Sequence, residues 1–96
     1  MDKRLLLTNL FDYYGELLTL KQQNCFKDYY FNNLSLQEIG DNESISRNAI
    51  FNQLKGVEVK LLLFENKLKM YERDKKLANI ISNIKDEKIR NELNNL

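Results

Sequence analysis

Apolar side chains recur every three or four residues along nearly the whole chain, and no proline interrupts them. Such spacing gathers apolar side chains on one face of an α-helix. Only three glycines occur in 96 residues, so the turn signals that separate strands are scarce. Because 43% of the residues are hydrophobic and 30% are charged, a folded state is expected. The sequence therefore predicts an all-α protein.

The first two helices are expected to be amphipathic. The first spans about residues 3–18, and its apolar face consists of Leu7, Leu10, Phe11, Tyr14, Leu17 and Leu18. Thr19 and Gln22 have the spacing of a capping box, which predicts that a second helix begins after Thr19 and runs to about residue 31. The apolar face of this second helix consists of Leu20, Phe26, Tyr29 and Tyr30.

A short helix, a turn and a long helix are expected next. Ser35 and Glu38 form a second capping box, so a third helix is predicted to end near residue 43. Residues 44–45 form the turn, and Ser46 is the N-cap of a fourth helix that runs from residue 47 to about 75. Gly40 is the small residue where these two helices cross, and their packing is assigned to Ile39, Ile45, Ile50 and Leu54. The pattern predicts a helix-turn-helix over residues 35–56.

The C-terminal tail has a less regular amphipathic pattern. Its apolar residues follow helical spacing as far as Ile84, but the next one, Ile89, comes five residues later. Two short helices joined near residues 85–86 fit this pattern better than one. We therefore expect a helical domain over residues 1–75 and a C-terminal helical extension over residues 76–96.

The second helix of the helix-turn-helix carries side chains suited to nucleic acid. Arginine reads guanine, asparagine reads adenine, and serine and lysine hold phosphates. Residues 35–56 contain two cations and three carboxylates, so counterion release supplies little affinity. We expect random duplex DNA to bind more weakly than about 10 μM at physiological salt. The candidate nucleic-acid-binding residues are Ser46, Arg47, Asn48, Phe51, Asn52 and Lys55.

A heptad runs through the fourth helix, with apolar residues three and four apart at Leu54, Val57, Leu61, Phe64, Leu68 and Tyr71. Glutamates follow the second apolar site of each heptad, and lysines precede the first site in two of them. Opposite charges would then face each other across a parallel dimer. The same stripe would equally serve as the face that packs on the chain's own helices. Both uses stay open, and a homodimer is among the expected assemblies.

Catalytic chemistry is poorly supported. The chain has no histidine, the commonest general base and metal ligand, and Cys25 therefore lacks the usual activating partner. There is no glycine-rich phosphate loop. We expect a protein that is not an enzyme and uses no metal, cofactor or small-molecule substrate. Cys25 is expected in the core, where free cysteine is common.

No segment has the character of a signal peptide or a membrane span. Three leucines follow the charged N-terminus before polar residues resume, and the longest later apolar run is residues 61–64. A single cysteine suits a reducing compartment. We therefore expect a cytoplasmic protein without a membrane span.

Several segments together carry a family resemblance. Residues 10–22 read LFDYYGELLTLKQ, residues 29–30 are both tyrosine, and residues 34–40 read LSLQEIG. The pattern continues through residues 45–47 and 49–51 and thins out at Leu61, Phe64, Glu65 and Leu68. Over roughly the first 70 residues the chain resembles the YlxM family of small bacterial proteins.

The resemblance implies an all-α fold with a helix-turn-helix similar to region 4 of sigma factors, and dimeric members. It also implies a regulatory role linked by gene neighbourhood to the signal recognition particle, without catalytic residues. Three positions depart from the family pattern: Glu43 replaces an apolar residue, Ser44 a turn glycine and Gly56 a basic residue. They weaken the expectation of strong DNA binding more than that of the fold.

Three functions are compatible with these observations. The first is a regulator in the signal recognition particle pathway, whose partner is that particle's protein or RNA. The second is a transcriptional regulator that reads DNA with Arg47, Asn48 and Asn52. The third is an adaptor that binds another helix through the heptad stripe.

Overall fold

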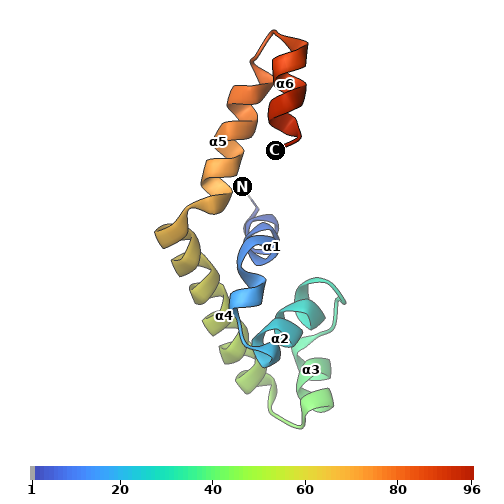
Figure 1. Cartoon of the computed structure of the whole chain (residues 1–96). Helices are drawn as coiled ribbons and strands as arrows, with labels where there is room; N and C mark the ends of the chain where they lie inside the picture. The colour runs from blue at the N-terminus through green and yellow to red at the C-terminus, as the bar shows by residue number, and fades with distance from the viewer. Residues whose placement is uncertain (1) are drawn as a thin grey trace.

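The computed structural model describes residues 2–96, and every regular element in this range is helical. The elements are α1 (Lys3–Tyr14), a 3-10 turn (Gly15–Leu17), α2 (Leu20–Tyr30), α3 (Leu36–Glu43), α4 (Arg47–Leu68), α5 (Met70–Ser82) and α6 (Glu87–Asn94). Helices α1–α4 form a body, and α5 extends from the C-terminal end of α4 while α6 runs back along it (Figure 1). The predicted all-α class is confirmed. None of the helices within residues 2–96 combines the length and apolarity needed to cross a bilayer.

Short-range capping explains where α2, α3 and α4 begin. Thr19 Oγ1 accepts from the Gln22 N–H at 3.2 Å, and the Gln22 side chain accepts from the Thr19 N–H at 3.0 Å. Ser35 and Glu38 make the same reciprocal pair. At the start of α4, Ser46 Oγ accepts from the Ala49 N–H at 3.0 Å. Each bond satisfies a backbone donor that a helix N-terminus leaves free. All three predicted N-caps are confirmed.

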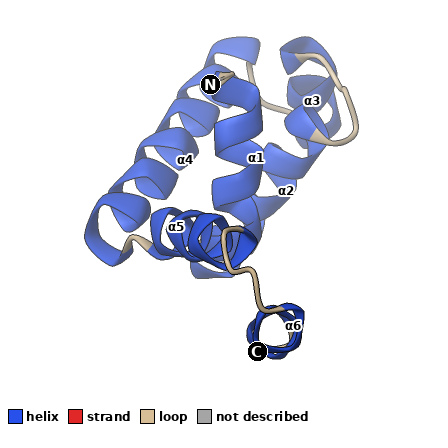
Figure 2. Ribbon diagram, turned by 90° about the horizontal axis from the view of Figure 1, so that it is seen from above, coloured by secondary structure: helices blue, strands red, loops and turns tan. Residues whose placement is uncertain are grey.

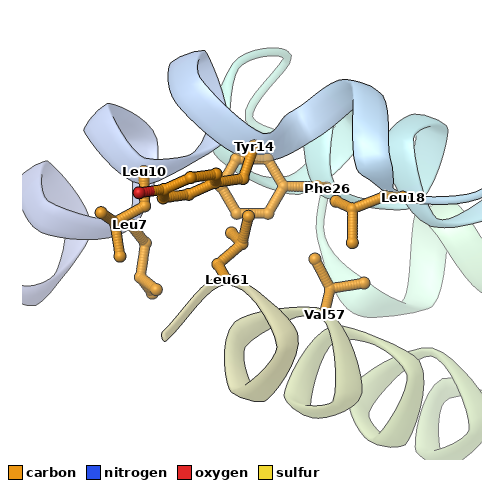
Figure 3. Close-up of a cluster of buried hydrophobic side chains, with 7 residues drawn as sticks. All are labelled: Leu7, Leu10, Tyr14, Leu18, Phe26, Val57 and Leu61. Atoms are coloured by element: carbon orange, nitrogen blue, oxygen red, sulfur yellow. The ribbon is translucent and has the colours of Figure 1, made fainter. Parts of the chain in front are cut away.

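The main core lies between α1 and α4 and is closed by α2 (Figure 3). It consists of Leu7, Leu10, Tyr14, Leu18, Phe26, Val57 and Leu61. A second cluster of Cys25, Ile39, Ile50 and Leu54 joins α2 and α3 to the first half of α4, with Ile45 packed against it. The predicted contacts between the two helices of the motif are therefore confirmed. Burial raises the pKa of Cys25 to about 11, so its thiol stays protonated and unreactive.

Two residues expected on apolar faces lie at the surface instead. α1 ends at Tyr14 and is followed by the tighter 3-10 turn, so the helical phase predicted to residue 18 shifts. As a result Leu18 is buried, whereas 59% of Leu17 is exposed. Leu20, the first residue of α2, is 75% exposed. The prediction that Leu17 and Leu20 belong to the apolar packing faces of their helices was wrong.

The predicted C-terminal end of the fourth helix was also wrong. α4 ends at Leu68, and Lys69 adopts the left-handed conformation with φ 55° before α5 begins. The Glu65 carboxylate accepts from the N–H groups of Tyr71 and Glu72, and the Tyr14 hydroxyl accepts from the Met70 N–H. The first turn of α5 is thus capped by side chains outside it, one of them on α1.

The tail contains the predicted join between two short helices. α5 ends at Ser82, and the Asp86 carboxylate caps α6 by accepting from the N–H groups of Lys88 and Ile89. The first of the two helices begins at residue 70 rather than 77, because the chain breaks at Lys69. The domain boundary expected after residue 75 falls inside α5, and the division into domain and extension stays a prediction.

Candidate nucleic-acid interface

Gly40 and Ser44 shape the corner between α3 and α4. A Cβ at residue 40 would lie 2.7 Å from the backbone oxygen of Ile45, closer than carbon and oxygen normally approach. Ser44 ends α3 in the left-handed conformation with φ 60°, and the Ile45 N–H donates to the Gly40 oxygen at 2.9 Å. The corner therefore depends on glycine at position 40 and fixes how α4 leaves α3.

All six candidate nucleic-acid-binding residues are exposed. Asn48, Asn52 and Lys55 lie on the side of α4 that faces away from the buried Ile50. Arg47 and Phe51 lie on the side of Leu54, and all three line one groove. The Ser46 hydroxyl oxygen already accepts from Ala49, so its proton and one lone pair remain for a ligand. Phe51 is 44% exposed, and Lys55 Nζ lies 5.4 Å from the centre of its ring. The face is open to a macromolecule along the first turns of α4.

A groove of about 690 Å³ lies beside this face, between α4, the start of α1 and the C-terminal end of α2. Seen from above, α1 lies between α4 on one side and α2 and α3 on the other (Figure 2). Tyr29, Tyr30 and Phe51 provide aromatic walls. The charged residues that line the groove are Asp2, Lys3, Arg4, Arg47, Lys55 and Glu58. Four cations against two carboxylates give the lining a net charge of +2.

The groove lining has a positive net charge, whereas residues 35–56, taken as a segment of the sequence, have a negative one. The carboxylates that make residues 35–56 acidic, Glu38, Asp41 and Glu43, are not among the residues that line it. Lys3 and Arg4, which are far from this segment in the sequence, do line the groove. Sequence reasoning missed both residues because only the packing of α1 brings them beside α4. Their single sequence signal is a pair of cations in the first turn of an amphipathic helix.

Glu58 organises the floor of the groove. Its side chain is 11% exposed and accepts from the Tyr30 hydroxyl at 3.0 Å. Its Oε1 also contacts Lys3 Nζ at 3.2 Å and Lys55 Nζ at 3.7 Å. The hydrogen bond to Glu58 raises the pKa of Lys3, and burial together with Glu58 raises that of Tyr30. Both groups therefore remain protonated at neutral pH.

Arg4 is held in place more firmly than the two lysines. Its Nη2 donates to the backbone oxygen of Tyr30 at 2.5 Å and to Asn33 Oδ1 at 3.3 Å. Its guanidinium carbon lies 5.2 Å from the centre of the Tyr30 ring, a cation–π distance. Arg4 thus places a fixed positive charge at the rim of the groove while it joins α1 to the end of α2.

The heptad stripe is mostly used inside the chain. Leu54, Val57 and Leu61 are buried, and Phe64 and Tyr71 are half-buried against the main core. Leu68 is 53% exposed. Tyr71 lies beyond the break at Lys69 and belongs to α5. The structure therefore shows the intramolecular use of the stripe, and the dimer seam stays a prediction.

Two crossed helices, a glycine-dependent corner and an open polar face define this chain as a helix-turn-helix protein. Residues 1–95 match the family described as "Putative helix-turn-helix protein, YlxM / p13 like", UPF0122. The chain is 45% identical over 84 residues to a UPF0122 protein of Malacoplasma penetrans, and the matched stretch covers 88% of this chain and 78% of that protein. A UPF0122 protein of Thermoanaerobacter sp. (strain X514) is 42% identical over 84 residues, with coverages of 88% and 72%. One of Clostridium acetobutylicum is 41% identical over 86 residues, with coverages of 90% and 74%. The chain belongs to this family, as its residues predicted.

Proposed function

We propose that this protein is a non-enzymatic regulator that binds duplex DNA through the exposed face of α4. The observation that carries the proposal is the position of this face beside a groove whose lining has a net charge of +2. Arg47, Asn48 and Asn52 are placed to meet base edges, and Lys55 to meet a phosphate. Because the cations are few, the affinity is modest, and the slope of log affinity against log salt is shallow, about 0.9 for each phosphate contact.

Fluorescence anisotropy with labelled duplexes at several salt concentrations tests this function. We expect binding at low salt, with a dissociation constant above about 10 μM for random sequence at physiological salt. A duplex selected from a random library should bind more tightly, and Asn48→Ala and Asn52→Ala should relax that preference. Asn91→Ala, which removes an exposed asparagine of α6, is the matched control. Absence of binding at low salt would overturn the proposal.

A second candidate function is the one that the resemblance to the YlxM family implies, regulation in the signal recognition particle pathway. Its partner would be the particle's protein or its RNA rather than a DNA site. Affinity purification from the native cell, analysed for both RNA and protein, separates the two functions. Recovery of the particle's GTPase or RNA by the wild type, and loss of either with Arg47→Ala, supports this candidate. Recovery of chromosomal DNA alone contradicts it.

A homodimer, or an adaptor role for the heptad stripe, needs a part of α4 that its own chain leaves open. Leu68 supports this role because it is 53% exposed, and Leu62 and Leu63 of α4 are also exposed. Leu68→Glu should therefore give monomers in sedimentation experiments without loss of helical circular dichroism. Leu61 is unsuitable for the same test because it is fully buried, and a charge there would unfold the body. An unchanged mass for Leu68→Glu would exclude this seam.

A further inference from the structure

We infer that the groove beside α4 is a phosphate-chain site, in which Lys3 and Lys55 turn from Glu58 to the oxygens of a bound phosphate. The inference rests on the proposed function for its natural ligand, the DNA backbone, and adds the start of α1 to the interface. It assigns a role to three residues outside the recognition face: Lys3, Arg4 and Glu58.

The lysines are accessible while the carboxylate that holds them is not. The side chains of Lys3 and Lys55 are 65% and 50% exposed, against 11% for Glu58. Both ammonium groups contact the same oxygen of Glu58, so they lie close together at the mouth of the groove. A phosphate has two or more oxygens that can accept from two such donors at once. Ion pairs this exposed hold weakly, so an incoming phosphate competes for the lysines.

Glu58 remains partnered when the lysines turn away from it. Its other oxygen, Oε2, accepts from the Tyr30 hydroxyl at 3.0 Å, and that hydroxyl belongs to α2. The buried carboxylate thus retains a hydrogen bond, which lowers the penalty of losing two cationic contacts. In the absence of a ligand, Glu58 thus holds the ammonium groups of Lys3 and Lys55 close together at the site where the phosphate would bind.

The remaining groove residues suit an extended anion better than a single ion. Arg4 is fixed at one rim by Tyr30 and Asn33, and Arg47 lies at the N-terminus of the 22-residue helix α4. A helix N-terminus adds a favourable field for negative charge. Cations at several points of one groove match successive phosphates of a chain. The carboxylates that oppose them within the lining are Asp2 and Glu58.

Nuclear magnetic resonance titrations at low salt with two probes, inorganic tripolyphosphate and a short DNA duplex, test the inference. We expect shifts of the backbone amides of residues 2–5 and 47–58 with both. Lys3→Gln should lower the slope of log affinity for the duplex against log salt by about 0.9, the value of one lost phosphate contact. Lys85→Gln, an exposed lysine of the α5–α6 link, is the matched control and should leave the slope unchanged.

Glu58→Gln gives the opposite and more diagnostic result. The amide oxygen still accepts from Tyr30, but the negative charge that competes for the lysines is gone. We expect affinity for tripolyphosphate to rise about fivefold, the effect of one unit charge at contact distance in water. If this variant does not fold, Lys3→Gln and Lys55→Gln, at exposed positions, decide the question alone.

The outcomes separate this inference from the proposed function. If the duplex binds but Lys3→Gln changes only thermal stability and not the salt slope, the ion pairs are structural and the inference is overturned. If tripolyphosphate shifts the groove amides while no duplex binds, the phosphate site stands and the DNA function fails. If tripolyphosphate shifts no groove amide, or binds Lys3→Gln as well as the wild type, the site is excluded.

Discussion

Three residues between helices of this chain adopt the left-handed conformation, and the two that directly follow α3 and α4 stand at junctions that are built in different ways. At the α3–α4 corner Ser44 has φ 60°, and at the α4–α5 break Lys69 has φ 55°. Neither residue is glycine, which adopts this conformation at the least cost. Each ends a helix and lets the next begin at once or within three residues. What differs is the origin of the contacts that hold each junction.

The corner is held by close sequence neighbours. The Ile45 N–H donates to Gly40, Ser46 caps α4 through Ala49, and the third helix begins at its own capping box. The break is held by tertiary contacts as well. Tyr14, on α1, donates to Glu65 at 2.6 Å and accepts from the Met70 N–H. Junctions made by neighbours leave a sequence signature, whereas junctions that depend on a distant helix leave none.

The largest effect should come from breaking the corner with Gly40→Ala. The added Cβ would meet the Ile45 backbone oxygen at 2.7 Å, so α3 and α4 must shift apart. We expect a loss of about 2–3 kcal/mol in the free energy of unfolding, typical of overpacking, measured by urea denaturation. Gly56→Ala is the control: a Cβ there meets nothing within 4 Å, and the variant should gain about 1 kcal/mol from helix propensity. Equal stabilities for the two variants would contradict this view of the corner.

The next largest effect should come from Glu65→Ala at the break. The carboxylate accepts from two N–H groups of α5 and from the Tyr14 hydroxyl, so its removal leaves three donors without their partner. We expect a loss of about 2 kcal/mol, as for hydrogen bonds to a charged group. Hydrogen exchange should quicken in residues 70–82 and stay slow at the corner. Glu92→Ala on α6 is the control, and protection retained throughout α5 would show that the cap is dispensable.

The sequence predicted those parts of the fold that depend on local contacts. The N-caps at Thr19, Ser35 and Ser46 and the core role of Gly40 and Ile50 followed from spacing alone. The end of α4 did not, because Lys69 carries no helix-stop signal and the Tyr14 hydroxyl, which accepts from the Met70 N–H, lies on α1. Leu17 was misplaced for a related reason. The 3-10 turn at Gly15–Leu17 rotates the chain relative to a continuous α-helix, so Leu18 rather than Leu17 faces the core.

For the candidate site, the sequence predicted the exposed residues of α4 but not the charge of the groove beside them. The exposed face of α4 followed from helical periodicity once Ile50 was placed in the core. Its charge did not, because Lys3 and Arg4 reach the groove only through the packing of α1, whereas Glu38 and Asp41 count in the segment but lie outside the groove. The net charge of a segment counts the charged residues that are close to a helix in the sequence. Binding of a polyanion depends instead on the charged residues that are close to the helix in the folded protein.

A smaller effect should show whether the two junctions carry the same strain. Ser44→Gly and Lys69→Gly each remove a side chain from a left-handed position, a gain that the added freedom of the unfolded chain partly offsets. We expect each variant to gain about 0.5 kcal/mol, measured by thermal denaturation. Lys67→Gly, in the last turn of α4, should instead lose about 1 kcal/mol. A loss of stability in Lys69→Gly alone would mean that the lysine side chain helps to hold the break.

The smallest effect concerns the second tyrosine that docks α5. The Tyr13 hydroxyl donates to Asp74 at 2.6 Å, and this bond raises the pKa of Tyr13 from its usual 10 to about 12. Folding therefore favours the neutral phenol, so the stabilisation is fully present below pH 10 and is lost as the pH rises toward 12. The difference in phenolate absorbance between wild type and Tyr13→Phe should give a midpoint near pH 12 in the folded protein. A midpoint near 10 would mean that Asp74 does not hold the phenol and that this bond does not help to dock α5.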